Sequence, residues 1–180
     1  MPSARDRVLD AYETLLIEAG PAATTLDAVA AGAGVSKGGL LYHFASKDAL
    51  AAGLLGRLQE RSAADAEAIR AAPEGAAAYY LHTSAPGGGI PGGLTRTYLA
   101  ALRVADHVRD GAVVRDALAA VDADALAALR ERLGEPVLAW LVQLVGDGLY
   151  LRTLIETPLP EGFGVDDLLN LLRPHLPPGG

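Results

Sequence analysis

The chain has 180 residues, of which 51% are hydrophobic, and it carries a formal net charge of −7. This length and composition fit one large globular domain or two small ones, and they exclude a disordered chain. The absence of cysteine excludes disulfides, a thiol nucleophile and a cysteine-ligated zinc site. The acidic balance argues against a nucleic-acid partner, and the first fifty residues, with four basic and six acidic side chains, do not reverse it. A DNA-binding function must therefore rest on the local placement of charge.

The N-terminal pattern predicts several helices in close succession. Apolar residues from Val8 to Leu16 recur on one side of a helix that begins after Ser3, and Gly20-Pro21 ends it. Two short helices are expected over residues 26–31 and 37–43, capped by Thr25 and Ser36 and separated by a turn at Gly32 and Gly34. A longer helix should begin at Lys47, after the cap Ser46, and run to about Ala71.

The remaining chain also favours helix, because alanine and leucine dominate while β-branched and aromatic residues are sparse. Helices are expected over residues 94 to about 109, 112–133, 136–155 and 165–172, and no segment has a convincing strand pattern. We therefore predict an all-α fold of about nine helices. An N-terminal three-helix domain (residues 1–47) should precede a second helical domain (residues 48–180).

The segment 85–93, APGGGIPGG, predicts a flexible loop. Its glycines Gly87, Gly89 and Gly92 formally satisfy the dinucleotide-binding pattern G-x-G-x-x-G. That pattern requires a preceding strand, whereas helical sequence precedes this one and Pro91 lies inside it. The loop interpretation is favoured, and a helical enzyme or nucleotide-binding protein that uses this loop and a C-terminal cavity is kept as the alternative function.

The most apolar stretch, residues 137–155, is interrupted by Gln143, Asp147 and Arg152, which argues against a membrane span. The N-terminal ten residues lack the basic-then-apolar pattern of a signal peptide. We therefore expect a cytoplasmic protein with no membrane partner.

Helical geometry predicts which side of the helix over residues 37–43 faces outward. Leu40 and Phe44 are four positions apart and apolar, so they should face the core, and Gly38 and Tyr42 then lie on the opposite side. Glycine costs helix stability, roughly 1 kcal/mol relative to alanine. Two glycines beside an exposed tyrosine suggest close approach to another molecule. Lys47, in a first helical turn where a cation is disfavoured, suggests a nearby phosphate.

The segment from Gly34 to Leu50, GVSKGGLLYHFASKDAL, resembles the helix-turn-helix DNA-binding domain of the TetR (tetracycline-repressor-like) family. The resemblance covers about residues 5–55 and implies that residues 37–43 form the recognition helix. Leu41 stands where many family members have tyrosine. By this resemblance, two groups of residues match DNA-contacting positions: Thr25, Tyr42, His43 and Lys47 at phosphates, and Ser36, Lys37, Gly39 and Leu41 at or near base edges.

For the C-terminal part, the resemblance implies a two-helix dimer interface and a ligand cavity. The expected partners are double-stranded DNA with a palindromic operator, a small-molecule effector of unknown identity and a second copy of the chain. No catalytic residue, metal or cofactor is expected. Amphipathic side chains in these helices are candidates for the ligand site, although each could instead serve packing: Tyr79, Tyr98, His107, Trp140, Asp147 and Tyr150. A DNA-binding dimer without a ligand also remains possible.

Overall fold

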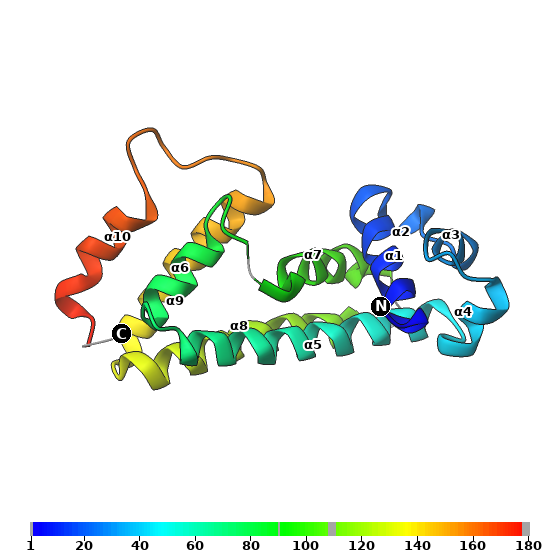
Figure 1. The fold of residues 1–180 in the computed structure, drawn as a ribbon, viewed down its shortest axis with the longest axis horizontal. Coiled ribbons are helices and arrows are strands. Elements are labelled where there is room, and N and C mark those ends of the chain that lie inside the picture. Colours follow the sequence, from blue (N-terminus) through cyan, green and yellow to red (C-terminus); the bar gives the residue numbers. More distant parts are fainter. Residues whose placement is uncertain (1, 90, 108–110, 178–180) are drawn as a thin grey trace. The chain divides into compact units, whose positions relative to one another are not determined.

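The computed structural model describes residues 2–89, 91–107 and 111–177. Over these residues the chain forms ten α-helices and three short 3₁₀ turns, with no strand (Figure 1). The predicted all-α fold is confirmed. The α-helices are α1 (Ala4–Glu18), α2 (Gly20–Ala23), α3 (Leu26–Gly32), α4 (Lys37–His43), α5 (Lys47–Ala71), α6 (Ala76–Ser84), α7 (Leu94–Val104), α8 (Gly111–Leu133), α9 (Pro136–Leu154) and α10 (Val165–Leu172).

Two compact units divide the chain. Unit 1 comprises Met1–Glu60 and Leu94–Val121, and unit 2 comprises Arg61–Gly93 and Asp122–Gly180. The long helices α5 and α8 each continue from one unit into the other along the chain. These two units are groups of residues that pack together. The predicted boundary between residues 47 and 48 instead separates a DNA-binding part from the rest of the chain, and it stays a prediction.

The core of unit 1 forms around α1. Ser3 and Asp6 make a reciprocal capping box at its start, and its apolar side, which includes Val8, Leu9 and Leu16, is almost fully buried. Helices α2, α3, α4 and α7 all contact α1 (Figure 1). Gly34 makes the turn between α3 and α4 with a φ of 64°, a conformation that L side chains rarely adopt.

A close contact between α5 and Phe44 depends on a second glycine. A Cβ atom at Gly53 would lie only 2.5 Å from Cε1 of the buried Phe44 ring. The missing side chain therefore lets α5 approach the residue that ends α4, and this contact fixes the orientation of α4 in unit 1.

Buried charges join three helices of unit 1. Glu13 on α1 is only 1% exposed, and it accepts hydrogen bonds from Arg57 Nη1 on α5 (3.3 Å) and from Thr97 Oγ1 on α7 (2.9 Å). Arg57 also pairs with Asp10 at 2.6 Å, and Arg96 on α7 approaches Glu13 at 3.5 Å. These bonds link α7 directly to the helix on which α3 and α4 pack.

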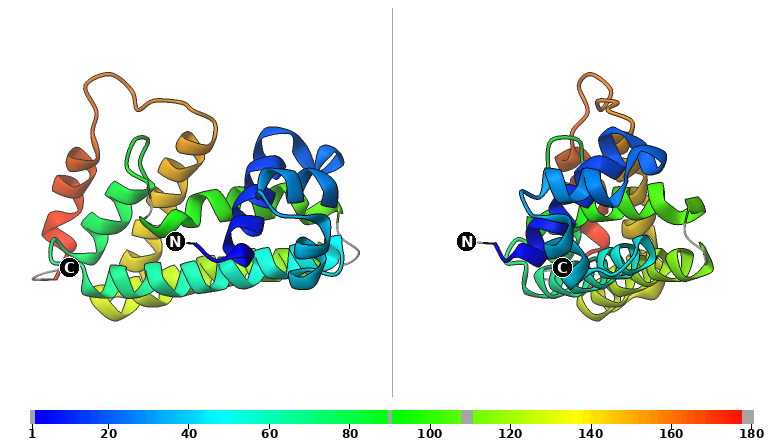
Figure 2. Two further views of the ribbon diagram at one scale, coloured as in Figure 1. Left: turned by 45° about the vertical axis from the view of Figure 1, so that its right-hand side comes forward. Right: turned by 90° about the vertical axis from the view of Figure 1, so that its right-hand side faces the viewer.

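Unit 2 is built on the packing of α6 against α9, and α10 lies beside α6 (Figure 2). Gly146 on α9 permits the first contact, because a Cβ atom there would lie 2.3 Å from Cε1 of Tyr80 on α6. The buried side of α9 includes Leu138, Val142 and Leu149. Its opposite side stays exposed.

The sequence prediction did not name α2 and α6 as separate helices. Pro21 lies in the first turn of α2, a place where proline is tolerated, so Gly20-Pro21 starts a short helix as well as ending α1. The helix expected from Leu94 reaches Val104 and continues as the 3₁₀ turn η2 (Ala105–His107), and its predicted end at Arg109 lies outside the described residues. The glycine-rich loop follows the helix α6, so the strand required by the dinucleotide pattern is not present before it.

Candidate functional site

The helix-turn-helix pair α3–α4 is held by the predicted caps. Thr25 Oγ1 accepts a hydrogen bond from the Ala28 backbone N–H (3.1 Å), and Ser36 Oγ accepts one from the Gly39 N–H (3.0 Å). Both hydroxyl-bearing residues are nevertheless exposed. Each can therefore cap its helix and still present a hydroxyl to a bound molecule.

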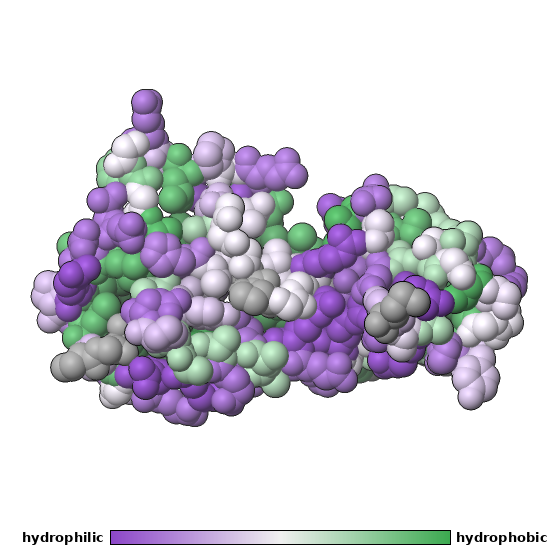
Figure 3. Space-filling model, viewed as in Figure 1, coloured by the Kyte–Doolittle hydropathy of each residue, from purple (hydrophilic) through white to green (hydrophobic). Residues whose placement is uncertain are grey.

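The outward side of α4 agrees with the helical geometry expected from the sequence. Leu40 is fully buried and Phe44 is 4% exposed, whereas Tyr42 is 86% exposed and Leu41 is 38% exposed. The Tyr42 ring packs edge-on against the exposed His43, with ring centroids 5.1 Å apart. In the view of Figure 3, the surface over α3 and α4 mixes apolar and hydrophilic residues.

The two glycines of α4 differ in how closely a Cβ atom would approach the rest of the chain. A Cβ atom at Gly38 would approach nothing closer than Ser36 Oγ at 4.0 Å, and one at Gly39 would lie 3.3 Å from the same oxygen. Both glycines are helical and neither has a positive φ. Packing within the chain therefore does not require Gly38.

Lys37 is paired with a residue that the sequence analysis did not single out. Its Nζ lies 3.0 Å from Asp27 Oδ1 and 3.1 Å from Oδ2, and both side chains are mostly exposed. A surface pair of this kind adds little stability, so it can open at small cost. A base or phosphate that binds Lys37 must displace Asp27. Because the two partners are ten positions apart in the sequence, no local sequence pattern predicts this pair.

Lys47, at the start of α5, is exposed, and its side chain has no hydrogen bond or ion pair within the described part of the chain. Its ammonium group is therefore available to an external anion. The eight residues that resemble DNA-contacting positions thus comprise seven exposed residues and the half-buried Gly39. All eight belong to α4, its flanking turns and the starts of α3 and α5.

The six candidate ligand residues divide between the two units. Tyr98 on α7 and His107 in η2 belong to unit 1, whereas Tyr79, Trp140, Asp147 and Tyr150 belong to unit 2. Trp140 is 55% exposed on α9. His107 is the one member of this set that lines a cavity in unit 1, which is formed by α1, α2, the start of α5 and the end of α7 with η2.

Two tyrosine–carboxylate pairs lie on the inner helices of unit 2. Tyr79 donates a hydrogen bond to Asp65 (3.1 Å), and Tyr80 donates one to Asp147 (3.2 Å). Burial raises the pKa of the Asp65 and Asp147 carboxyls above the usual range. The pKa of Asp122 is also raised, first by burial and then by the charge of Asp147. Sequence analysis named Tyr79 and Asp147 but missed Asp65 and Asp122, which no local pattern connects to them.

The exposed side of α9 is an apolar stripe, defined as Val137, Trp140, Leu141, Leu144, Leu151 and Ile155, which are 46–69% exposed. Their spacing of three, four or seven positions keeps them on one side of the helix. Gly148 lies in the same register and has open space around it. By length and composition alone, α9 could also cross a membrane, but it carries Asp147 and Arg152.

Residues 8–54 match the family model described as bacterial regulatory proteins, tetR family. The N-terminal domain of this chain belongs to the TetR family. The matched segment runs from α1 into α5 and contains all eight predicted DNA-contacting residues. Among curated protein sequences, none matches the chain significantly.

Solved structures extend the likeness to the whole chain. The multidrug binding protein EbrR in complex with imidazole is 25% identical, with 100% of this chain and 98% of that one covered and a TM-score of 0.61. EbrR in complex with malachite green is 24% identical, with 98% and 100% covered and a TM-score of 0.64. A TetR-family member from Streptomyces coelicolor A3 is 23% identical, with 98% and 100% covered and a TM-score of 0.61. The chain therefore has the fold of TetR-family regulators in both of its parts.

Proposed function

We propose that this protein is a ligand-responsive transcriptional repressor, not an enzyme, that acts in the cytoplasm and binds a palindromic operator as a homodimer. The observation that carries the proposal is the outward side of α4. It joins an exposed tyrosine, a glycine (Gly38) that internal packing does not explain and adjacent residues capable of phosphate contacts. A recognition helix inserted into a major groove uses such a surface.

In the proposed complex, α4 lies in the major groove and reads base edges with Ser36, Lys37 and Leu41, while Gly39 permits close approach. Thr25, Tyr42, His43 and Lys47 bind phosphates and fix the register. Two copies pair through the α9 stripe, and the two α4 helices lie one DNA turn apart, roughly 34–36 Å. An effector that binds better to a different spacing shifts the population towards release.

The test of DNA binding is selection from a randomised duplex pool, followed by fluorescence anisotropy on the enriched duplex. The wild type should enrich a near-palindrome, and Tyr42→Ala combined with Lys47→Ala should weaken binding at least about tenfold, because two phosphate contacts are lost. Tyr150→Phe in unit 2 is the matched control and should bind normally. Failure of the wild type to enrich any sequence at low salt would contradict the proposal.

Replacing Gly38 by alanine should stabilise the protein but weaken its binding to the operator. Gly38→Ala should raise the free energy of unfolding by about 1 kcal/mol, because alanine favours helix and its methyl group meets open space. The same methyl group should weaken operator binding several-fold by holding α4 away from the base edges. Urea unfolding and anisotropy measure the two effects. A variant that is more stable and binds normally would show that this glycine does not face DNA.

For the effector we propose a lipophilic aromatic cation. EbrR, which shares the fold, has been solved with malachite green and with ethidium. Unit 2 of the present chain holds Asp65, Asp122 and Asp147 near Tyr79 and Tyr80. Burial raises the pKa of all three carboxyls, so their negative charge is held at a cost in stability. A bound cation would relieve this cost, and the aromatic rings could stack on it.

Malachite green binding tests this effector class. Asp122→Asn combined with Asp147→Asn should weaken binding at least about tenfold in calorimetry, because two attractive charges are removed. The carboxyl pKa is higher in the folded protein than in the unfolded chain. The free energy of unfolding is therefore greatest below the pKa of the unfolded chain, and it falls as the pH rises through the raised pKa of the folded protein. The neutral variant should therefore be at least as stable as the wild type at pH 7. Glu161→Gln, at an exposed loop position, is the control. Equal affinity of all three proteins would exclude these carboxylates from the site.

A further inference from the structure

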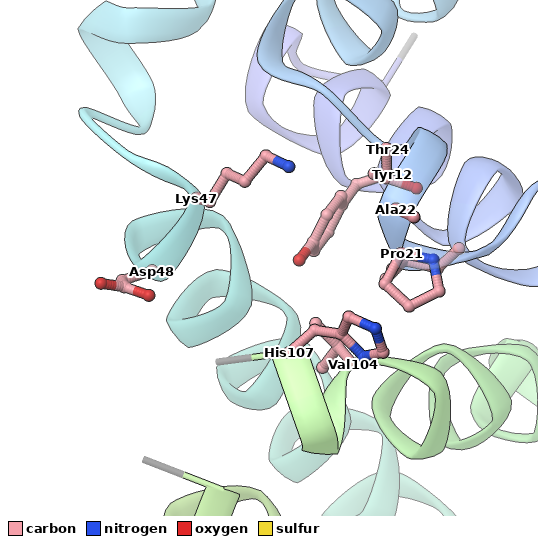
Figure 4. Close-up of a pocket in the computed structure, with 9 residues that line it drawn as sticks. Tyr12, Pro21, Ala22, Thr24, Lys47, Asp48, Val104 and His107 are labelled. Atoms are coloured by element: carbon pink, nitrogen blue, oxygen red, sulfur yellow. The ribbon is translucent and has the colours of Figure 1, made fainter. Parts of the chain in front are cut away.

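A cavity of about 190 Å³ lies within unit 1, where α1, α2, the start of α5 and the end of α7 with η2 meet (Figure 4). Leu16, Pro21, Ala22 and Val104 form its apolar wall. An apolar cavity of about 150 Å³ is large enough to bind benzene. The space in unit 1 therefore suits a molecule with a single ring or a branched chain of similar size.

The hydroxyl of Tyr12 reaches into this cavity without a partner. Tyr12 is 4% exposed, and its hydroxyl makes no hydrogen bond within the described part of the chain. Figure 4 shows the hydroxyl directed into the space between Lys47 and His107. Burial, together with the charge of Asp48, raises the pKa of Tyr12 to about 12, so the hydroxyl remains protonated and able to donate at neutral pH. A ligand that enters the cavity would supply the acceptor that the Tyr12 hydroxyl lacks within the chain.

Two further donors line the same space. Lys47 and His107 are exposed, and neither side chain has a hydrogen bond or ion pair to the residues that the structure describes. The other polar residues that line the cavity, Thr24 and Asp48, do not add a free donor to it. Thr24 already donates to the Gly20 carbonyl (2.8 Å), and the Asp48 carboxylate lies on the other side of α5 from the Tyr12 ring in Figure 4. Three donors thus face one apolar space, an arrangement complementary to an anion with an apolar body.

We propose that this cavity is a binding site for a small monocarboxylate that carries one ring or a branched apolar chain. Its carboxylate accepts hydrogen bonds from Tyr12, Lys47 and His107, and its apolar part packs against Leu16, Pro21 and Val104. The negative charge of Asp48 opposes any bound anion, and it opposes a dianion such as phosphate more strongly than a monocarboxylate. This site lies in unit 1 and selects anions, so it differs from the cation site proposed for unit 2.

Occupation of the site has a consequence that rests on the proposed DNA-binding function. Lys47 is the residue proposed to contact a phosphate, and a bound carboxylate would engage the same ammonium group. The carboxylate and the operator should therefore compete, whereas binding of the carboxylate to the free protein does not depend on any DNA partner.

The probe is benzoate, titrated calorimetrically into the full chain without DNA. Benzoate should bind in a 1:1 ratio, with benzyl alcohol and phosphate at least about tenfold weaker. Tyr12→Phe should weaken benzoate about fivefold or more, and Lys47→Gln about tenfold, because each removes a donor to a charged group. Ala22→Leu should block the site by filling it. Arg130→Gln, which alters an exposed cation on α8 outside the cavity, should bind benzoate normally, and circular dichroism checks that each variant is folded.

Absence of benzoate binding would overturn the proposal, as would binding that Tyr12→Phe, Lys47→Gln and Ala22→Leu all leave unchanged. Phosphate binding as strong as that of benzoate would overturn the monocarboxylate assignment, because the apolar wall would then contribute nothing. Benzoate that binds normally while operator affinity stays the same would support the site and overturn only its competition with DNA. A protein that binds no DNA but binds benzoate with the predicted variant pattern would overturn the proposed function and leave this site intact.

Discussion

Leu141→Arg combined with Leu144→Arg should convert the proposed homodimer to a monomer and lower affinity for the proposed operator at least about a hundredfold. Both leucines lie in the apolar stripe of α9, at 46% and 50% exposure in the single chain. A stripe of this length is costly to leave in water, and in the proposed homodimer a second copy of the same stripe would cover it symmetrically. Two arginines per chain would place four like charges in that interface. A monomer has one recognition helix and engages only half of a palindrome.

Sedimentation velocity gives the oligomeric state, and anisotropy on the selected duplex gives the affinity. Leu171→Arg is the matched control, because Leu171 is 74% exposed on α10 and lies outside the stripe. This control should remain dimeric and bind DNA. A double variant that stays dimeric would assign the dimer interface to another surface. A monomeric variant with wild-type affinity would remove the need for a dimer in DNA binding.

The orientation of α4 could be predicted from sequence because it depends on local periodicity. The apolar pair Leu40 and Phe44 fixes the buried side, and the exposure of Tyr42 follows from the angle between successive helical residues. The caps at Thr25 and Ser36 were predictable for the same reason, since each bonds a backbone group three residues later.

Contacts between distant residues could not be predicted. The hydrogen bond from Thr97 to Glu13 joins positions 84 apart, and nothing in either local sequence indicates it. The ligand candidates were chosen by residue type, and the structure divides them between two units because α7 with η2 belongs to unit 1. The apolar spacing from Val8 to Leu16 predicts that Tyr12 lies on the buried side of its helix. The burial of Tyr12 confirms that prediction, but only the structure shows its hydroxyl directed into a cavity.

Arg57→Met should lower the free energy of unfolding by about 3–5 kcal/mol. Arg57 has a side chain only 8% exposed, and it pairs with Asp10 at 2.6 Å and with the buried Glu13 at 3.3 Å. It also donates to the Asp6 carbonyl at 3.1 Å. Methionine fits the space but leaves the Glu13 carboxylate buried with less compensating charge. Urea unfolding measures the loss, and Arg103→Met, at an exposed position on α7, should cost less than about 1 kcal/mol.

The charge explanation can be separated from a packing explanation by a second substitution. Glu13→Gln keeps a hydrogen-bonding side chain but removes the buried charge, so the double variant with Arg57→Met should recover part of the lost stability. Losses that simply add would mean that the Arg57 stem, not its charge, matters. The same Glu13 carboxylate accepts the hydrogen bond from Thr97 on α7, so its charge holds α7 to α1. A change that weakens this cluster should therefore also loosen the connection between α7 and the helices that present the recognition surface.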